Sequence, residues 1–426
     1  MFILVKNEQK ICHFALLCKE EIDCKKEKNA LKDKHSFIIP HGGMSMSYQL
    51  NLVPKIVYGS GAVSETGAQV SRLGCKRPFI VTDPGIAALG LLDPLKASLT
   101  AAGHAFEIFD KAELEPSADS IQACADAAKA FKADCMIGFG GGSPLDTAKA
   151  ALVLLTNEGG IDQYFGMNMV KTPLLPAIYI PTASGTGSEV TSISVLTNAK
   201  TGAKQGVVSE LMYGKVVVLD PDLTVGLPPH VTAMTGMDAF VHAMESFTGL
   251  AATPFTDALN LQAMRLVAAN LRKAYANGGN KEARAGMLYA ATLAGMGFSQ
   301  TQNGIIHAVG TNLANNKVPH GLAMAALAPM GMSFNCIAVP EKYAQIATIL
   351  GAQCTGCALG TARKGVEAMY GLLADVGIAP GLKAHGVPRD ALEGIAERAA
   401  GAKRLIDNNP RKANAKQILA LLEEFY

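Results

Sequence analysis

Short apolar runs alternate with helix-like stretches through the first half of this chain, and this alternation constrains its fold more than any other feature. The runs are PFIVT (78–82), AFEIF (105–109), CMIGF (135–139), AIYIP (177–181) and VVVLD (216–220). Apolar runs separated by helical patterns predict parallel strands joined by crossover helices. After GLPPH (226–230) these runs stop, and Ala-, Leu- and Met-rich periodic stretches continue to Phe425. We therefore expect an α/β domain with a parallel sheet over residues 46–226 and an all-helical domain over residues 227–426.

A glycine-rich turn follows the run at 135–139. It contains, in order, Gly140, Gly141, Gly142, Ser143 and Pro144, and an apolar-periodic stretch begins there. Ser143 suits the N-cap of a helix, and Pro144 suits its first position. Glycines let a backbone approach a pyrophosphate, and the free N–H groups of a helix start favour its charge. The turn thus predicts a diphosphate site. It is neither a Walker A loop nor a complete GxGxxG, and a tight turn without a ligand is the alternative.

A second polar loop follows the run at 177–181. IYIPTASGTGSEVTS gathers hydroxyl side chains around two glycines, including those of Thr182, Ser184, Thr186, Ser188 and Thr191. Hydroxyl and N–H groups in such a loop can hold a nucleotide. The alternative is a Ser/Thr-rich turn with local side-chain to backbone hydrogen bonds.

Asp83 ends another of the apolar runs, in PFIVTDPG. A carboxylate at this place can accept hydrogen bonds from an adenosine ribose 2′-OH and repel a 2′-phosphate, which favours NAD over NADP. An Asp-Pro turn without a ligand is the alternative.

One carboxylate and three imidazoles in the second half are arranged as a metal site requires. Asp238 and His242 in TGMDAFVHAMESF have i,i+4 spacing, so a helix presents both on one face. His307 lies in FSQTQNGIIHAVG, and His320 lies between Pro and Gly, which predicts a loop leading onto a new helix. Oxygen and nitrogen donors without thiolate suit Fe²⁺ or Zn²⁺. A helix salt bridge and hydrogen-bonded core histidines are the alternatives.

Several segments together resemble the iron-dependent (group III) alcohol dehydrogenase family. They are GGGSPLDTAK (140–149), PTASGTGSEVT (181–191), DPDLT (220–224), TGMDAFVHAMESF (235–247) and PHG (319–321), in the family's order over residues 46–426. The resemblance implies a catalytic metal, Fe²⁺ with Zn²⁺ as the alternative, bound by Asp238, His242, His307 and His320. It also implies an NAD site that comprises Asp83, Gly140, Gly141, Gly142, Ser143, Asp146, Thr182, Thr186, Thr191, Lys204 and Leu223.

The chemistry implied by this resemblance is hydride transfer between NAD(H) and a small primary alcohol or aldehyde at the metal. The nucleotide loops fall in the first domain and the metal ligands in the second, so we expect the site in the cleft between them. A related reductase or lyase of the same fold, such as a maleylacetate reductase-like enzyme, is one alternative. A non-catalytic nucleotide-binding protein is another.

The chain departs from the family at Thr311. Four residues after His307 the family often has a second His in the substrate pocket, and the segment leading to His320 is slightly shorter here. The proton path therefore stays open between Thr311 and a solvent chain through the ribose hydroxyls. A core or solvent-facing threonine without a catalytic role is the alternative for Thr311.

Composition narrows the partners and the compartment. Only 17% of the residues are charged and the net charge is +2. The body of the chain has no basic run of the kind that binds nucleic acid, so small molecules are the expected partners. The apolar stretch 322–340 contains Pro329 and Asn335, which favours a buried helix over a membrane span.

Nine scattered cysteines, with a single CxxC at Cys354 and Cys357, do not indicate a disulfide framework or a zinc site and suit the reduced cytoplasm. The resemblance suggests a homo-oligomer.

Residues 1–45 differ from the rest of the chain. FILV is too short for a signal-peptide core, and CKEEIDCKKEKNALKDK is charge-rich. The segment from Met46 reads like a natural start. We expect this extension to be disordered or to result from an upstream start codon, with a short targeting or docking helix as the alternative.

Overall fold

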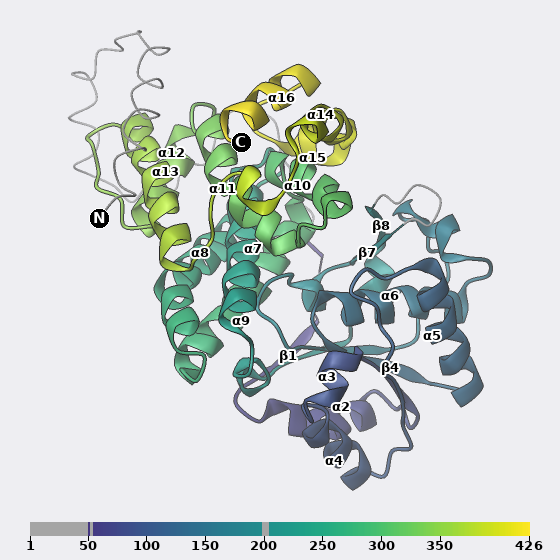
Figure 1. Cartoon of the computed structure of the whole chain (residues 1–426). Coiled ribbons are helices and arrows are strands. Elements are labelled where there is room, and N and C mark those ends of the chain that lie inside the picture. The colour runs from purple at the N-terminus through teal and green to yellow at the C-terminus, as the bar shows by residue number, and fades with distance from the viewer. Residues whose placement is uncertain (1–49, 52–53, 198–203) are drawn as a thin grey trace.

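A sheet-containing region and a helical region make up this computed structural model, which describes residues 50–51, 54–197 and 204–426 (Figure 1). The expectation for residues 1–45 lies outside the described residues.

The main sheet has six strands in the order β1-β9-β6-β4-β2-β3. These are β1 (Lys55–Tyr58), β2 (Pro78–Val81), β3 (Glu107–Phe109), β4 (Cys135–Gly140), β6 (Ala177–Pro181) and β9 (Val216–Leu219). Every pairing in this sheet is parallel, so the sequence prediction for the five apolar runs is confirmed. From β2 the chain moves outward to β3 and then returns to β4 on the other side of β2. The crevice at the carboxyl ends of β2 and β4 is therefore a topological switch point, where α/β folds bind ligands.

Helices cover both faces of this sheet. One apolar cluster joins Ile80, Ile137 and Ile178 of the strands to α2 (Thr66–Arg72) and α4 (Asp93–Ala101). The other cluster joins the alternate strand residues to α5 (Ala118–Phe131) and α6 (Gly142–Thr156) and continues into the helical region. Because side chains alternate between the faces of a strand, burial on both faces requires the continuous apolar runs seen in the sequence.

A second, small sheet was not predicted from the sequence. Its order is β5-β8-β7, formed by β5 (Gly166–Met167), β7 (Ile193–Thr197) and β8 (Lys204–Val208). β7 and β8 are antiparallel and only partly buried, so neither strand carries the unbroken apolar run of a fully buried one.

The second half is helical from Pro229 onward, as predicted. Its helices are α7 (Pro229–Thr248), α8 (Pro254–Ala276), α9 (Lys281–Thr301), α10 (Ile305–Gly310), α11 (His320–Asn335), α12 (Pro340–Ile349), α13 (Ala358–Asp375), α14 (Leu392–Gly401), α15 (Lys403–Asn408) and α16 (Ala415–Glu424). Thr253 and Thr256 form a capping box that starts α8. Buried Arg284 donates to Thr232 Oγ1 and Leu227 O, which fixes the start of α7 against α9.

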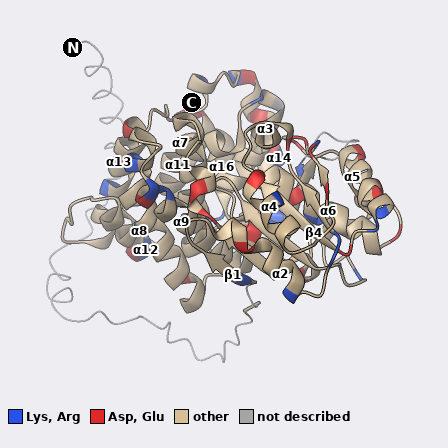
Figure 2. Ribbon diagram, turned by 90° about the horizontal axis from the view of Figure 1, so that it is seen from below, with Lys and Arg blue, Asp and Glu red and all other residues tan. Residues whose placement is uncertain are grey.

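Charge is mixed over the whole molecule. Figure 2 shows Lys and Arg interspersed with Asp and Glu along both the sheet-containing and the helical region. Among the described residues, no helix has the length and apolar character needed to cross a membrane. Six cysteines of the described ranges are free thiols, including Cys354 and Cys357.

Candidate metal and nucleotide site

The four residues predicted as metal ligands come together in the structure. Asp238 and His242 lie on α7, His307 on α10 and His320 at the first position of α11, and one ligating atom of each lies within 4.8 Å of the others. Asp238 Oδ1 is 3.8 Å from His242 Nδ1, 4.0 Å from His307 Nε2 and 3.7 Å from His320 Nε2. Atoms about 2.0–2.2 Å from a shared ion would be separated by about 3–4 Å, so these separations suit one cation.

The facing atoms of this cluster lack hydrogen-bond partners within the described part of the chain. Asp238 Oδ1, His242 Nδ1 and His307 Nε2 are all buried and unpaired. Buried polar atoms in proteins are otherwise almost always satisfied. Three such atoms converging on one point therefore fit a metal ion as the missing partner.

Other side chains hold the imidazoles in place. Glu245 Oε2 lies 2.6 Å from His307 Nδ1, which leaves Nε2 of that ring facing the cluster. The Phe298 ring stacks on His242 at 4.3 Å, and a hydrogen bond joins His242 to the backbone of Gly185. Gly185 belongs to the polar loop at 181–191, so the metal cluster and that loop are in direct contact.

Burial governs the protonation of the cluster. It raises the pKa of Asp238 to about 7, against the opposing effects of His307 and Lys204. Burial, together with the neighbouring His307, lowers the pKa of His242 well below its usual range and that of His320 to about 3. The imidazoles of His242 and His320 are therefore neutral at neutral pH, as metal ligands must be.

The crevice between β2 and β4 contains the first group of predicted nucleotide residues. Asp83 follows β2 and is the N-cap of α3 (Pro84–Ala88), where its Oδ1 accepts from Ile86 N at 2.9 Å. Gly140 ends β4 with φ 147°, and a Cβ on it would lie 2.7 Å from Pro144 Cγ and 3.6 Å from Asp83 Oδ2. The turn after β2 that contains Asp83 and the glycine-rich turn after β4 therefore lie side by side at the carboxyl edge of the sheet.

The start of α6 differs from the sequence prediction. The N-cap is Gly141 and the first helical residue is Gly142, so Ser143 and Pro144 lie two positions further into the helix than expected. The Ser143 hydroxyl instead donates to Leu114 O at 2.6 Å. A Cβ on Gly141 would meet no atom within 4 Å, whereas one on Gly142 would lie 2.8 Å from Thr186 Cγ2. Gly141 thus faces open space, and Gly142 marks the contact between the two polar loops.

A buried lysine fixes the second loop from inside. Lys149 donates to Ser188 O, Ser188 Oγ, Thr191 Oγ1 and Ile193 O at 2.5 to 3.0 Å. The two oxygens of Asp146 accept from Ser188 Oγ at 2.6 Å and from Val195 N at 2.9 Å. Asp146 and Thr191 are therefore engaged within the protein, where they shape the loop.

Of the remaining expected residues, Thr182 and Thr186 belong to the second loop, and Lys204, Leu223 and Thr311 lie on other elements. Thr182, which is buried, donates its backbone N–H to Gly140 O at 2.9 Å, and Thr186 Oγ1 accepts from Ser188 N. Lys204 Nζ pairs with Glu115 Oε2 at 2.9 Å, and Leu223 is buried in the core beneath. The Thr311 hydroxyl donates to His307 O at 2.8 Å, one turn back along the helix.

The second loop is attached firmly to the helical region. A Cβ on Gly187 would lie 2.6 Å from Gly295 Cα, and one on Gly295 would lie 2.7 Å from Gly187 O. Beside this backbone contact, Thr292 donates to buried Glu189 at 2.8 Å. The loop is therefore supported by α9, the helix that also carries Phe298.

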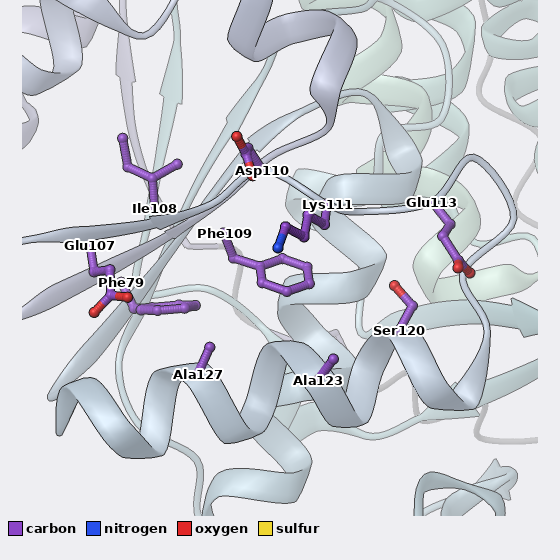
Figure 3. A pocket seen from close by; sticks show the side chains of 10 residues that line it. All are labelled: Phe79, Glu107, Ile108, Phe109, Asp110, Lys111, Glu113, Ser120, Ala123 and Ala127. Carbon is purple, nitrogen blue, oxygen red and sulfur yellow. The ribbon is translucent and has the colours of Figure 1, made fainter.

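A separate hollow of about 490 Å³ lies between β3 and α5 (Figure 3). Phe79 and Phe109 face Ala123 and Ala127 there, and Lys111 and Glu113 reach its rim (Figure 3). None of the predicted metal or nucleotide residues lines it.

Sequence reasoning missed Glu245, Phe298 and Lys149 as parts of the site. Asp238, His242 and Glu245 are related as i, i+4 and i+7, and such residues share one face of a helix. This spacing could have predicted that Glu245 lies beside the metal cluster. Phe298 and Lys149 act through contacts between distant segments, for which the sequence carries no comparable signal.

A crevice of the nucleotide-binding type beside one carboxylate and three imidazoles fits a metal-dependent oxidoreductase. The sequence model of the Iron-containing alcohol dehydrogenase family matches residues 54–221, and that of the Fe-containing alcohol dehydrogenase family, C-terminal, matches residues 232–426. The chain belongs to the iron-containing alcohol dehydrogenase family.

Individual relatives agree with this assignment. A sulfoacetaldehyde reductase from Bilophila wadsworthia is 59% identical over 382 residues, which cover 89% of this chain and 99% of that protein. The structure of a 1,3-propanediol oxidoreductase is similar with a TM-score of 0.87 and 37% identity, covering 89% of this chain and all of the other. A sulfoacetaldehyde reductase from Bifidobacterium kashiwanohense in complex with NAD⁺ has a TM-score of 0.78 and 27% identity, with 90% and 99% covered. The protein is accordingly an oxidoreductase of alcohols and aldehydes.

Proposed function

We propose that this protein reduces sulfoacetaldehyde to its alcohol with NADH at a divalent iron. The observation that carries the proposal is the convergence of four ligating atoms within 4.8 Å, directly against the loop at 181–191. The high identity to the sulfoacetaldehyde reductase of Bilophila wadsworthia, over nearly all of that protein, supports the substrate.

Asp238, His242, His307 and His320 would hold the metal. When bound, the ion polarises the aldehyde carbonyl and stabilises the negative charge that develops on its oxygen. Glu245 keeps the ligating nitrogen of His307 turned to the cluster, and Phe298 keeps the plane of His242 fixed. These contacts mean that the ligands need little rearrangement to bind the ion.

The crevice between β2 and β4 would hold the dinucleotide. Gly141 leaves its backbone accessible at the start of α6, a 15-residue helix whose free N–H groups favour a diphosphate. Asp83, at the carboxyl end of β2, would accept a hydrogen bond from a ribose hydroxyl, which favours NAD over NADP. Thr182, Thr186 and Lys204 would complete the nucleotide site, whereas Asp146 and Thr191 support the loop.

Charge favours an anionic substrate at this site. A single carboxylate offsets only part of the charge of a divalent ion, and the positive charge of Lys204 lies close enough to influence both Asp238 and His320. A sulfonate or similar anion bound nearby is therefore attracted to the site.

The test is anaerobic oxidation of NADH by the iron-reconstituted protein with sulfoacetaldehyde, propanal and other short aldehydes, beside a metal-free control. Metal-dependent turnover with the highest kcat/KM for sulfoacetaldehyde supports the proposal. Metal-dependent turnover that prefers neutral aldehydes would reject this substrate. NADH binding without turnover of any aldehyde would favour a lyase of the same fold or a non-catalytic nucleotide-binding protein.

Three further expectations belong to the same proposal: the domain boundary, the cellular compartment and the oligomeric state. The division into domains at residues 226 and 227 agrees with the gap between the two family matches, 54–221 and 232–426. Free cysteines suit a cytoplasmic protein. A homo-oligomer, which the family resemblance suggests, is tested by light scattering of the purified protein.

A further inference from the structure

Gln302 has a backbone conformation that only glycine adopts freely. It ends α9 with φ 70° and ψ 178°. For a residue with a side chain this region costs on the order of 1–3 kcal/mol, and it persists where the surroundings impose it, most often at functional sites.

The surroundings of Gln302 impose this conformation from several sides. Its N–H donates to Phe298 O at 2.7 Å, and its carbonyl accepts from Thr301 Oγ1 at 3.1 Å. Asn408 Nδ2 donates to Asn303 O at 2.9 Å and contacts Gln302 O at 3.4 Å. These hydrogen bonds thus hold the link between α9 and α10 in one conformation, although a glycine at position 302 would adopt the same backbone angles without the conformational strain.

This link connects two helices that contact the metal cluster. It follows α9, on which the Phe298 ring stacks on His242, and leads into α10, which carries His307. The next residue, Gly304, donates to Glu245, the carboxylate that orients His307. Residues 302 and 303 therefore belong to the segment between Phe298, which packs on His242, and the ligand candidate His307.

Two carboxamides in this segment have unused hydrogen-bonding capacity. Gln302 Oε1 and Asn303 Oδ1 are buried and have no partner among the described residues, and Asn303 is only 8% exposed. Neither side chain therefore serves the fold in the way that a buried amide normally does. A half turn about the last side-chain bond exchanges the oxygen for an NH₂ group, so each can present two donors to a ligand.

We propose that the carboxamides of Gln302 and Asn303 form the subsite that binds the sulfonate of the substrate. The inference rests on the proposed function and deepens it. A sulfonate carries three acceptor oxygens and one negative charge, which two adjacent NH₂ groups match without a buried cation of their own. Gln302 and Asn303 follow Phe298, which packs on His242, and precede His307, so a sulfonate bound by them would leave the aldehyde end of the same small molecule close to the metal cluster.

The test uses Asn303→Leu, which removes the donors at similar size, and Gln302→Gly, which removes the side chain and relieves the backbone. For each, kcat/KM is measured with sulfoacetaldehyde and with propanal in the iron-loaded enzyme. The inhibition constant of ethanesulfonate, a sulfonate without a carbonyl, is measured against propanal. Asn270→Leu is the matched control, because Asn270 is half-buried on α8 and its amide donates to Leu266 O, one turn back along the same helix.

We expect kcat/KM for sulfoacetaldehyde to fall about 10- to 100-fold in both variants, mainly through KM, because hydrogen bonds to a charged group are lost. The inhibition constant of ethanesulfonate should rise by about tenfold or more, while propanal turnover stays within about threefold of wild type. Gln302→Gly should also unfold at the same temperature as wild type or a higher one. Asn303→Asp, which keeps the shape and adds a repelling charge, gives the same test if Asn303→Leu folds poorly.

Two results overturn the subsite. One is an equal loss with sulfoacetaldehyde and propanal, which would make these residues structural supports of the metal. The other is an unchanged inhibition constant for ethanesulfonate. Failure of the proposed function is distinct from both, because the wild-type enzyme itself would then prefer propanal and ethanesulfonate would not inhibit it.

Discussion

The Glu245 carboxylate contacts Nδ1 of His307 at 2.6 Å and also accepts the backbone N–H groups of Gly304 and Ile306. It therefore fixes both the ring and the first turn of the helix that carries it. We expect Glu245→Gln to weaken iron binding about 10- to 100-fold, since an amide holds the required tautomer less firmly. Iron affinity is measured by competition with a chelator, and exposed Glu282→Gln on α9 is the control. Wild-type affinity in Glu245→Gln would show that this contact does not tune the metal.

His242→Ala removes one of the four converging ligands without touching the crevice between β2 and β4. Turnover should fall by at least about a hundredfold, because the ion supplies several kcal/mol of transition-state stabilisation. NADH binding, followed by its fluorescence, should persist. Turnover close to that of wild type would contradict the assignment of His242 as a ligand.

Gly141 and Gly142 offer a matched pair of substitutions. Gly141→Ala adds a methyl group in open space, so its melting temperature should match wild type while its NADH affinity falls, because the methyl group stands where a diphosphate approaches. Gly142→Ala forces a Cβ to within 2.8 Å of Thr186 Cγ2, so it should cost about 1–3 kcal/mol of stability. Calorimetry and NADH titration separate the two effects. Unchanged NADH affinity in Gly141→Ala would move the diphosphate elsewhere.

Lys149 gives a pH dependence of stability. Burial lowers its pKa from 10.5 to about 8 in the folded protein, against the opposing effect of Asp146. Between these pH values the unfolded chain holds a proton that the folded protein has released, so the free energy of unfolding rises with pH. The contribution is up to about 1.4 kcal/mol per pH unit. Urea unfolding at pH 8 and pH 9.5 should show this rise in wild type and not in Lys149→Met. Parallel changes in the two proteins would mean that Lys149 is not the source.

The sequence predicted those features in which residue type and spacing alone decide the outcome. Strands buried on both faces need unbroken apolar runs. Short runs such as PFIVT and CMIGF, which lie between helical patterns, therefore predict buried parallel strands. The half-exposed β7 and β8 lack such runs and were missed. The helix start at Gly142 was misplaced because Ser143 bonds to Leu114 O, a partner 29 residues away. The strain at Gln302 was invisible for the same reason, since Asn408 helps to impose it.

The backbone contact between Gly187 and Gly295 has a thermodynamic consequence. It attaches the loop beside the nucleotide crevice to α9, whose Phe298 stacks on His242. Binding of NADH in the crevice would therefore affect the stability of the metal site, and binding of the metal would affect the crevice. Such coupling is reciprocal: if iron tightens the hold on NADH by some factor, NADH tightens the hold on iron by the same factor. A high concentration of reduced dinucleotide would then protect the enzyme's metal against chelators.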